Sequence, residues 1–533
     1  MRVRRTLVAA ALIATLMVSC GDDDDEGARG GQTDTPTECP ANAASSTLTM
    51  GVFSETSGLD PTVSNGGGAT GGTELAAIYD TLMRWDPQAE EYVPQVAEAL
   101  EHDEQFNTWT LHLRDGVNFG NGDPLVAADV IASVDRHRGE DSNSPVAGLA
   151  SLIASMESPD EKTVVFNLSE PWSGFPFLLA GPLGMITNPR VVEQLGAEEF
   201  NQLPVGAGVG PFEPVRFAPG EELVMKARDD YWAGRPCIGE LRFVAITGGE
   251  ATLDALERGE IDVAFLREPL AIDQARRAGY ESHADLKSMG SVILINSGVR
   301  GSTPPTTDVR VRQAIAAALD PEAIDARVND GLGAPGSAIF NEKSRWYQEL
   351  EGPAHDPEGA KDLVEAVKAE RDWDGSIKLI CDNSPSRVET GIAVQGQLEA
   401  VGFKVDLNTS ATISDLIDAV IIDANFELAC WGLNTYEEEA WAPLADYLST
   451  DGGANRSGYS DPAMDAALDA LRVAGSHEES LEALADVQEI WNRTVPHVVL
   501  GASEEVIAWR DGVSGLEFNR DTIVMFGNAR IEG

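Results

Sequence analysis

The sequence predicts an α/β fold built from more than one lobe, and three observations lead to this prediction. The chain has 533 residues, which is long for one compact domain and favours two or more lobes. Apolar residues make up 43% of it, enough to fill a large core. Residues 376–381 and 403–407 read as buried strands on either side of a helical stretch. This β-α-β pattern is typical of a parallel sheet.

Other elements follow from the period of the apolar residues. We expect a first strand at 48–52, a helix over TELAAIYDTLMRW at 73–85, a crossover strand at 292–296 and a returning strand at 497–503. The crossover strand would enter a second lobe. The returning strand would bring the chain back to the first.

The chain is strongly acidic, with a formal charge of −50 from 38 Lys and Arg against 88 Asp and Glu. Such a chain has little with which to neutralise phosphates, so we expect no nucleic-acid partner. The acidic residues are spread along the whole sequence, which favours a role in solubility. Attraction of cationic ligands is the alternative interpretation.

The N-terminus reads as an export signal. A basic start at residues 2–5 precedes an apolar run at 7–18 that is too short to span a bilayer. The residues before Cys20 resemble the cleavage box of a bacterial lipoprotein. We therefore expect a signal peptide at 1–19, a lipid on Cys20 and a charged, glycine-rich tether at 20–46. A plain secretory signal is the alternative.

Four further cysteines remain in the exported chain: Cys39, Cys237, Cys381 and Cys430. An even set outside the cytoplasm indicates disulfides, with three possible connectivities. Cys381 and Cys430 both lie in apolar, strand-like runs of one presumed lobe, so we expect the pairs Cys381–Cys430 and Cys39–Cys237. A zinc site is the alternative, but no CxxC or HxxxH spacing supports it. We expect no metal and no cofactor.

Two strings in the sequence are long enough to be informative. Residues 109–130 read WTLHLRDGVNFGNGDPLVAADV. They begin with the alternation of a half-buried strand, turn at Asn121-Gly122 and continue in a helical pattern. Residues 308–320 read DVRVRQAIAAALD and place their apolar side chains on one face of a helix, with aspartates suited to capping.

These strings resemble the signatures of the extracytoplasmic solute-binding proteins of peptide/nickel-type ABC importers. The first matches the family pattern LR.GV.F..G.PL.A.DV and the second matches vR.Ai..alD. The resemblance implies a two-lobed periplasmic-binding-protein fold, class II-like, with mixed sheets flanked by helices. It places lobe I at 47–67, 205–290 and 498–533, an additional small subdomain of lobe I at 68–204, and lobe II at 291–497.

The resemblance also implies a function. A lipid-anchored monomer would capture a peptide or other small solute between two closing lobes and deliver it to the permease and ATPase of an ABC importer. It would work at the outer face of the cytoplasmic membrane or in the periplasm. The sequence contains no GxSxG or HExxH motif, so we expect no enzyme. The alternatives are a secreted binding, sensor or chaperone-like protein without a transporter, and a secreted hydrolase.

The expected ligand site follows a strand that carries a tryptophan. In family members that bind peptides, an aspartate there pairs with the ligand ammonium; here the stretch is WGLNTYEEEAW at 431–441, and Asn434 offers hydrogen bonds but no charge. Glu437 to Glu439 are another source of charge, although a solvated acidic surface is the favoured interpretation. The residues expected to line or brace the site are Trp431, Asn434, Tyr436, Trp441, Asn455, Asp60 and Trp172.

Three aromatic residues, Trp172, Phe175 and Phe177, cluster in one loop. Such a trio suits either core packing or a pocket wall, and the sequence leaves both interpretations open.

Overall fold

The computed structural model describes residues 39–532 apart from 41–42, 65, 140–141 and 143. The predicted signal peptide at 1–19 and the expected lipid site Cys20 lie outside these residues. Of the helices in the described ranges, none is long and apolar enough to cross a membrane.

Eleven of the described strands form one mixed sheet. In sheet order they are β15 (Lys404–Ala411), β14 (Ser376–Asp382), β16 (Leu428–Thr435), β12 (Glu281–Ile295), β17 (His497–Trp509), β11 (Val263–Leu266), β1 (Thr47–Val52), β10 (Glu240–Ala245), β9 (Glu222–Ala227) and β8 (Phe212–Ala218), while β13 (Ala334–Pro335) pairs with β17. β14 runs parallel to both β15 and β16. The predicted parallel β-α-β unit is therefore confirmed.

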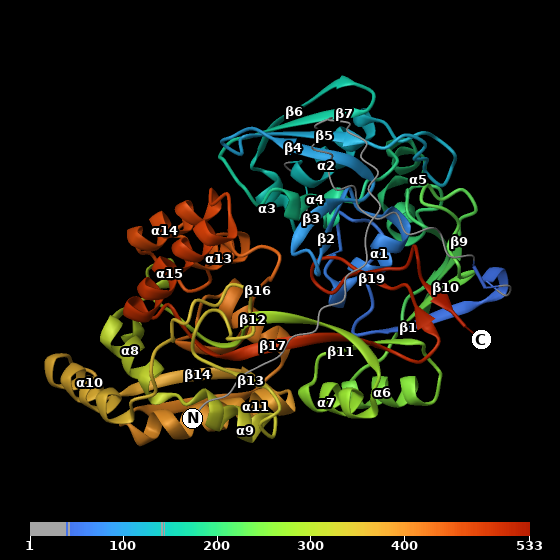
Figure 1. Ribbon diagram of the computed structural model, residues 1–533. Coiled ribbons are helices and arrows are strands. Elements are labelled where there is room, and N and C mark those ends of the chain that lie inside the picture. The colour runs from blue at the N-terminus through green and yellow to red at the C-terminus, as the bar shows by residue number, and fades with distance from the viewer. Residues whose placement is uncertain (1–38, 41–42, 65, 140–141, 143, 533) are drawn as a thin grey trace, which may run out of the picture. The chain divides into compact units, whose positions relative to one another are not determined.

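Two long strands, β12 and β17, join the two halves of this sheet. The first part of β12 pairs with the end of β17, which also pairs with β11, whereas the last part of β12 pairs with β16. The register shifts between Lys287 and Val292, where Met289 and Gly290 have φ of 63° and 50°. A bulge of this kind bends a strand. Figure 1 shows both strands running from the side of β14 and β16 to that of β11.

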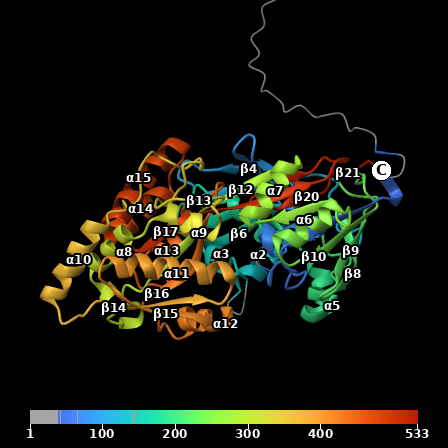
Figure 2. The same ribbon diagram turned by 90° about the horizontal axis from the view of Figure 1, so that it is seen from below.

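Helices cover each half of the sheet, and each half has its own core. On the β14 side lie α8 (Val309–Ala318), α9 (Pro321–Val328), α10 (Pro357–Glu370) and α11 (Pro385–Ala400), and near β11 lie α6 (Gly249–Glu257) and α7 (Pro269–Ala278) (Figure 2). Ile315, Val364 and Leu398 belong to one buried cluster with side chains of β14 and β16. Leu48 and Phe243 belong to another cluster in the other half.

The second signature string caps its helices as expected. The Asp308 carboxylate accepts a hydrogen bond of 3.0 Å from the Arg310 amide at the start of α8. The Asp320 carboxylate accepts one of 3.1 Å from the Ala323 amide in α9. Such caps satisfy amides that have no partner within the helix.

A separate four-stranded antiparallel sheet lies between β1 and β8 in the sequence. It consists of β4 (Ala97–His102), β5 (Thr108–Leu113), β7 (Thr163–Leu168) and β6 (Ile153–Asp160), and the hairpin β2 (Met83–Asp86) and β3 (Glu91–Pro94) precedes it. The helices of this region are α2 (Ala127–Arg138), α3 (Ala147–Ala150), α4 (Pro176–Leu179) and α5 (Pro189–Gln202). β5, a turn at Gly122 with φ of 87° and α2 confirm the strand, turn and helix predicted for 109–130.

The helix predicted for 73–85 is wrong in its second half. α1 (Gly72–Tyr79) stops at Asp80, which has φ of 55°, and strand β2 begins three residues later. The Asp80 carboxylate accepts hydrogen bonds from Thr81, Gln95, Tyr231 and Trp232. These tertiary contacts hold Asp80 outside the helix, although the local apolar pattern favours its continuation.

The remaining helices are α12 (Ile413–Ile417), α13 (Trp441–Leu448), α14 (Pro462–Arg472) and α15 (His477–Thr494). After β17 the chain forms two short strand pairs, β18 (Val513–Ser514) with β21 (Arg530–Ile531) and β19 (Glu517–Phe518) with β20 (Val524–Met525). The Val524 amide donates to the hydroxyl of Thr73 in α1. The chain therefore returns to the first half of the sheet, as the sequence predicts.

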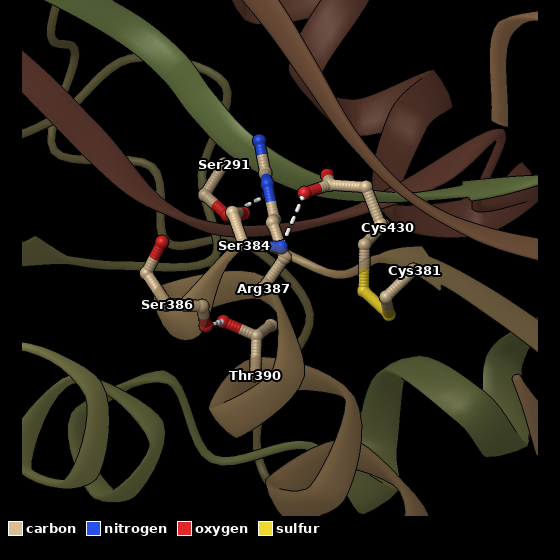
Figure 3. The surroundings of a disulfide bond; sticks show 8 residues. Ser291, Cys381, Ser384, Ser386, Arg387, Thr390 and Cys430 are labelled. Carbon is tan, nitrogen blue, oxygen red and sulfur yellow. Dashed lines mark hydrogen bonds between the residues drawn. A yellow bond between two sulfur atoms is a disulfide. The ribbon is translucent and has the colours of Figure 1, made fainter. Parts of the chain in front are cut away.

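Cys381 on β14 and Cys430 on β16 form a disulfide, with Cα atoms 4.8 Å apart, which confirms this predicted pair. Figure 3 shows Arg387 extending from α11 beside this bond toward Ser291, to whose hydroxyl its guanidinium donates at 3.1 Å. Cys39 and Cys237 are disulfide-bonded as well. Their pairing with each other stays a prediction.

Candidate ligand-binding site

A cavity of about 510 Å³ lies where the β2–β3 hairpin and the four-stranded sheet meet α13, α14 and the start of α15. Its aromatic lining consists of Trp85, Tyr92, Phe106, Trp109, Trp346 and Trp441, and its carboxylates are those of Glu90, Glu91, Glu438 and Glu439. No lysine or arginine is found among the described residues that line it. This cavity is open to solvent, and aromatic walls with a few polar groups are the usual lining of a small-molecule site.

Two other cavities, of about 500 and 250 Å³, lie beside the 335–355 loop and between α7 and α9. In the described part of the chain, neither is lined by a residue that the sequence predicts for the site. The cavity beside α13 is lined by Trp441. We therefore take this one as the candidate site.

Trp172 and Trp441 meet behind the cavity wall, with ring centroids 5.1 Å apart. The indole N–H of buried Trp172 donates to Oε1 of Glu439 at 3.4 Å. Trp172, Phe175 and Phe177 all belong to the buried core of the four-stranded subdomain. The aromatic trio is therefore core packing, and it supports the wall that Trp441 forms.

Tyr436 lies beside a buried group of charges. Its ring centroid is 5.8 Å from that of Phe177, 5.2 Å from Nζ of Lys287 and 5.8 Å from Cζ of Arg520. The charge of Asp521, followed by burial, raises the pKa of Tyr436 above its ordinary value. The phenol therefore stays protonated at neutral pH.

Lys287 stands at the centre of these charges and is only 2% exposed. Its Nζ lies 2.7 Å from Asp521, 3.3 Å from Asp285 and 3.8 Å from Glu505. Burial lowers the pKa of Lys287, but these carboxylates together raise it well above the usual range. The ammonium stays charged, and three carboxylates already surround it. β12 and β17 supply Lys287, Asp285 and Glu505, so the cluster lies where these two strands pair, next to the register shift.

Glu438 and Glu439 are 5% and 7% exposed, so the solvated acidic surface favoured from the sequence is wrong for these two residues. Tyr92 covers the backbone of Glu438 through a hydroxyl contact of 3.5 Å. Both oxygens of Glu437 accept hydrogen bonds, from the Ser344 hydroxyl and the Arg345 amide. Glu437 therefore anchors the 344–346 loop.

The carboxyl groups of Glu438 and Glu439 differ in how they are satisfied. Both oxygens of Glu439 have donors, in Trp172 and in the Ala442 amide at 2.6 Å. Oε1 of Glu438 accepts from the Asp521 amide at 2.7 Å, but its Oε2 is buried and has no hydrogen-bond partner in the part of the chain that the structure describes. Burial, then Asp285, raises the pKa of Glu438 to about 8, and burial raises that of Glu439 to about 7.

Trp431 and Asn434 lie on β16 and not on the walls of this cavity. Trp431 is opposite Val292 of β12 and packs against two hydrophobic clusters. The Asn434 carbonyl accepts a hydrogen bond of 3.3 Å from the Tyr447 hydroxyl. Their contact with a ligand stays a prediction.

Asn455 and Asp60 are held in other parts of the structure. The Asn455 amide donates to the carbonyls of Ser449 and Tyr459, and so it braces its own loop. Asp60 is buried and forms an ion pair of 2.5 Å with Arg136. Neither lines the cavity, and their roles toward a ligand also stay predictions.

The sequence did not single out Lys287, Asp521, Trp346 or Arg345. Arg345 stacks its guanidinium on Trp346 at 4.4 Å and on Trp85 at 5.3 Å, and it pairs with Glu90 at 3.3 Å. The residues around Lys287 read as an ordinary half-exposed strand, so no local signal marks its burial.

Comparison with known proteins agrees with this architecture. Residues 91–455 match the family model of the bacterial extracellular solute-binding proteins, family 5. The chain is 23% identical over 480 residues to the di/tripeptide-binding protein 2 of Pseudomonas aeruginosa, a match that covers 85% of this chain and 89% of that protein.

Solved structures show the same fold at low identity. One is the oligopeptide-binding protein AppA from Bacillus subtilis in complex with a nonapeptide, with a TM-score of 0.75, 18% identity and coverage of 91% of this chain and 99% of that one. Another is the binding protein AgaA from A. tumefacien R10 in complex with agropinic acid, with a TM-score of 0.75, 24% identity and the same coverage.

A mixed sheet whose two halves are joined by two long strands places the chain in the two-lobed α/β fold class of these binding proteins. The chain belongs to the bacterial extracellular solute-binding proteins of family 5, whose model matches well over half of it. The predicted family and fold class are therefore confirmed.

Proposed function

We propose that this protein captures a short peptide in the 510 Å³ cavity and delivers it, chemically unchanged, to the permease of an ABC importer. The observation that carries the proposal is the cavity itself, whose walls come from 83–109, 173–176, Trp346 and 438–480. Its volume suits a small ligand. The peptide-binding relative and the peptide-bound neighbour support a peptide as the solute.

Strands β12 and β17, which join the two halves of the main sheet, offer a way to couple ligand binding to closure of the lobes. The cavity walls at 83–109 and 173–176 belong to the proposed lobe I subdomain, and those at 346 and 438–480 belong to the proposed lobe II. Lobes I and II share the main sheet, whose two halves β12 and β17 join. A ligand that touches both walls stabilises the closed arrangement over an open one. The closed form would be the one that the permease recognises. The lobe boundaries predicted from the sequence, with lobe II at 291–497, are part of this proposal.

The membrane attachment is a further part of the proposal. The lipoprotein-like box before Cys20 supports a lipid at that residue, which would hold a monomeric binding protein at the membrane surface. Metabolic labelling with a radioactive fatty acid tests it. Label on the wild type that is lost in Cys20→Ala supports the anchor, and equal labelling of both chains contradicts it.

Titration calorimetry with a library of two- to five-residue peptides tests the function. We expect one peptide per chain and, in small-angle scattering, a smaller radius of gyration for the bound protein than for the ligand-free protein. Absence of binding to every peptide would overturn the choice of solute. An unchanged radius of gyration at saturation would overturn closure, and peptide cleavage would favour a hydrolase.

A further inference from the structure

We infer that the turn at residues 520–522, the tip of the β19–β20 hairpin, is a latch that holds lobe II against lobe I. We infer further that ionisation of Glu438 releases this latch. The inference rests on the proposed function, because it concerns the closure of the two proposed lobes. It adds the contact that fixes the arrangement seen in the structure and the condition that opens it.

The first support is the strained backbone of this turn. The Ile523 amide donates to the Arg520 carbonyl at 3.2 Å, so Asp521 and Thr522 are the central residues of a β-turn. Their φ values are 55° and 56°. Positive φ at both central residues is typical of a type I′ turn, where Asn-Gly and Asp-Gly are the usual pairs. A residue with a branched side chain is held there only by its surroundings, and such strain is common in switch regions.

The second support is that the turn is fixed firmly to one side of the molecule. It forms hydrogen bonds or ion pairs of 2.7–3.0 Å with five residues of lobe I and its subdomain. These residues are Gly68, Phe177, Asp285, Lys287 and Glu505. The turn would therefore stay with lobe I when lobe II moves.

The turn reaches lobe II through Glu438. The Asp521 amide donates to Oε1 of Glu438 at 2.7 Å. Glu438 is 5% exposed and lies in the segment that continues into Trp441 of the cavity wall. Movement of lobe II away from lobe I must break this buried hydrogen bond, and the wall segment would move with Glu438.

The third support is the charge around Glu438. Its Oε2 has no hydrogen-bond partner among the residues that the structure describes. Lys287 is already surrounded by three carboxylates, and the Arg520 guanidinium lies on the Phe177 ring. The charged or titratable groups near Glu438 are Asp285 and Lys287 of β12, Glu505 of β17, Arg520 and Asp521 of the turn, Tyr92 of β3, the adjacent Glu437 and Glu439, and Arg345. An ionised Glu438 would add a further carboxylate to a buried site whose cations already have partners.

Protonation of Glu438 therefore decides which arrangement is stable. Burial, followed by the charge of Asp285, raises its pKa from 4.5 to about 8 in the arrangement seen in the structure. Opening would expose Glu438 to water and return its pKa toward 4.5. The closed form then holds a proton that the open form releases, so rising pH favours the open form. The ratio of open to closed chains should rise about tenfold for each pH unit in this window and level off above pH 8.

The competing interpretation is that Glu438 is a neutral acid that serves only the stability of the fold. A structural acid changes the free energy of unfolding with pH but leaves the arrangement of the lobes unchanged. A latch changes the arrangement itself. The radius of gyration of the folded protein distinguishes the two interpretations.

The experiment is small-angle scattering of the ligand-free full chain at pH 6 and pH 9, with circular dichroism to confirm that each sample is folded. Glu438→Gln keeps an oxygen that accepts from the Asp521 amide but cannot ionise, and Glu438→Ala removes the acceptor. Glu74→Gln is the matched control. Glu74 is also a buried carboxyl group whose pKa burial raises, to about 7, but it lies on α1 and not at the turn.

We expect a larger radius of gyration for the wild type at pH 9 than at pH 6, because the ratio of open to closed chains rises about a hundredfold between pH 6 and 8. Glu438→Gln should keep the smaller radius at both pH values, and Glu74→Gln should behave as the wild type does. Glu438→Ala should have the larger radius already at pH 6. If Glu438→Ala does not fold, the comparison of the wild type with Glu438→Gln decides.

An equal radius of the wild type at both pH values overturns the inference, and so does an increase that persists in Glu438→Gln or is lost in Glu74→Gln. A folded Glu438→Ala with the smaller radius at pH 6 overturns it as well. Peptide capture stands in each of these cases. Because no ligand is present, failure of every peptide to bind overturns the proposed solute and leaves the latch in place.

Discussion

Replacing Glu438 with glutamine is expected to remove a pH-dependent loss of stability from the ligand-free protein. Burial first, and the charge of Asp285 second, raise the pKa of Glu438 from 4.5 to about 8. Between these two values the folded protein keeps a proton that the unfolded chain releases. The free energy of unfolding therefore falls as the pH rises through this window, and it stops falling above pH 8.

The size of the effect follows from proton linkage. One proton held by the folded state alone corresponds to about 1.4 kcal/mol for each pH unit. Relative to Glu438→Gln, the wild type should lose roughly 3 kcal/mol between pH 4.5 and 7, and roughly 4 kcal/mol between pH 4.5 and 8. The glutamine amide that replaces the Glu438 carboxyl group also changes the free energy of unfolding, but this change does not vary with pH. The slope against pH is therefore the quantity to compare.

Urea unfolding followed by circular dichroism, at several values from pH 5 to 8, measures this slope. Glu439 and Glu74, whose pKa values are raised to about 7 by burial, titrate in both proteins and cancel in the difference. Glu91→Gln is the matched control, because Glu91 lines the same cavity but is exposed. A difference between wild type and Glu438→Gln that stays constant from pH 5 to 8 would refute the reasoning.

Three further outcomes are expected. Replacing Cys381 and Cys430 together with alanine should cost about 4 kcal/mol of unfolding free energy, because the bond closes a loop with a sequence separation of 49; an unchanged denaturation midpoint would argue against this. Lys287→Met should lower the free energy of unfolding by about 3–5 kcal/mol, because it leaves three carboxylates without their cation. The loss should be smaller at pH 5 than at pH 8, and equal losses at both pH values would contradict this prediction. Trp441→Ala should weaken peptide binding roughly tenfold or more, and calorimetry showing an unaltered affinity would remove it from the wall.

Elements governed by local pattern could be predicted from the sequence. The parallel unit of β14, α11 and β15 has alternating or continuous apolar runs that describe its burial directly. The Cys381–Cys430 bond follows from two cysteines on strands of one lobe. The helix caps at Asp308 and Asp320 depend on side chains adjacent in the sequence.

Features set by distant contacts could not be predicted. The α1 helix stops at Asp80 because Tyr231 and Trp232, about 150 positions later, hold its carboxylate. Glu438 is buried under the subdomain and bonded to Asp521, 83 positions away. A run of three glutamates reads as a solvated surface unless these contacts are known. The burial of Lys287 also depends on distant contacts, those with Glu505 and Asp521, and so it could not be predicted.

The central claim is that this protein holds an intact solute and does no chemistry on it. Native mass spectrometry of the full chain incubated with defined peptides tests it most directly. We predict one peptide bound per chain, with the mass of the added peptide, and recovery of that peptide unaltered after denaturation. Bound fragments, or a chain that carries no peptide at saturating concentration, would contradict the claim.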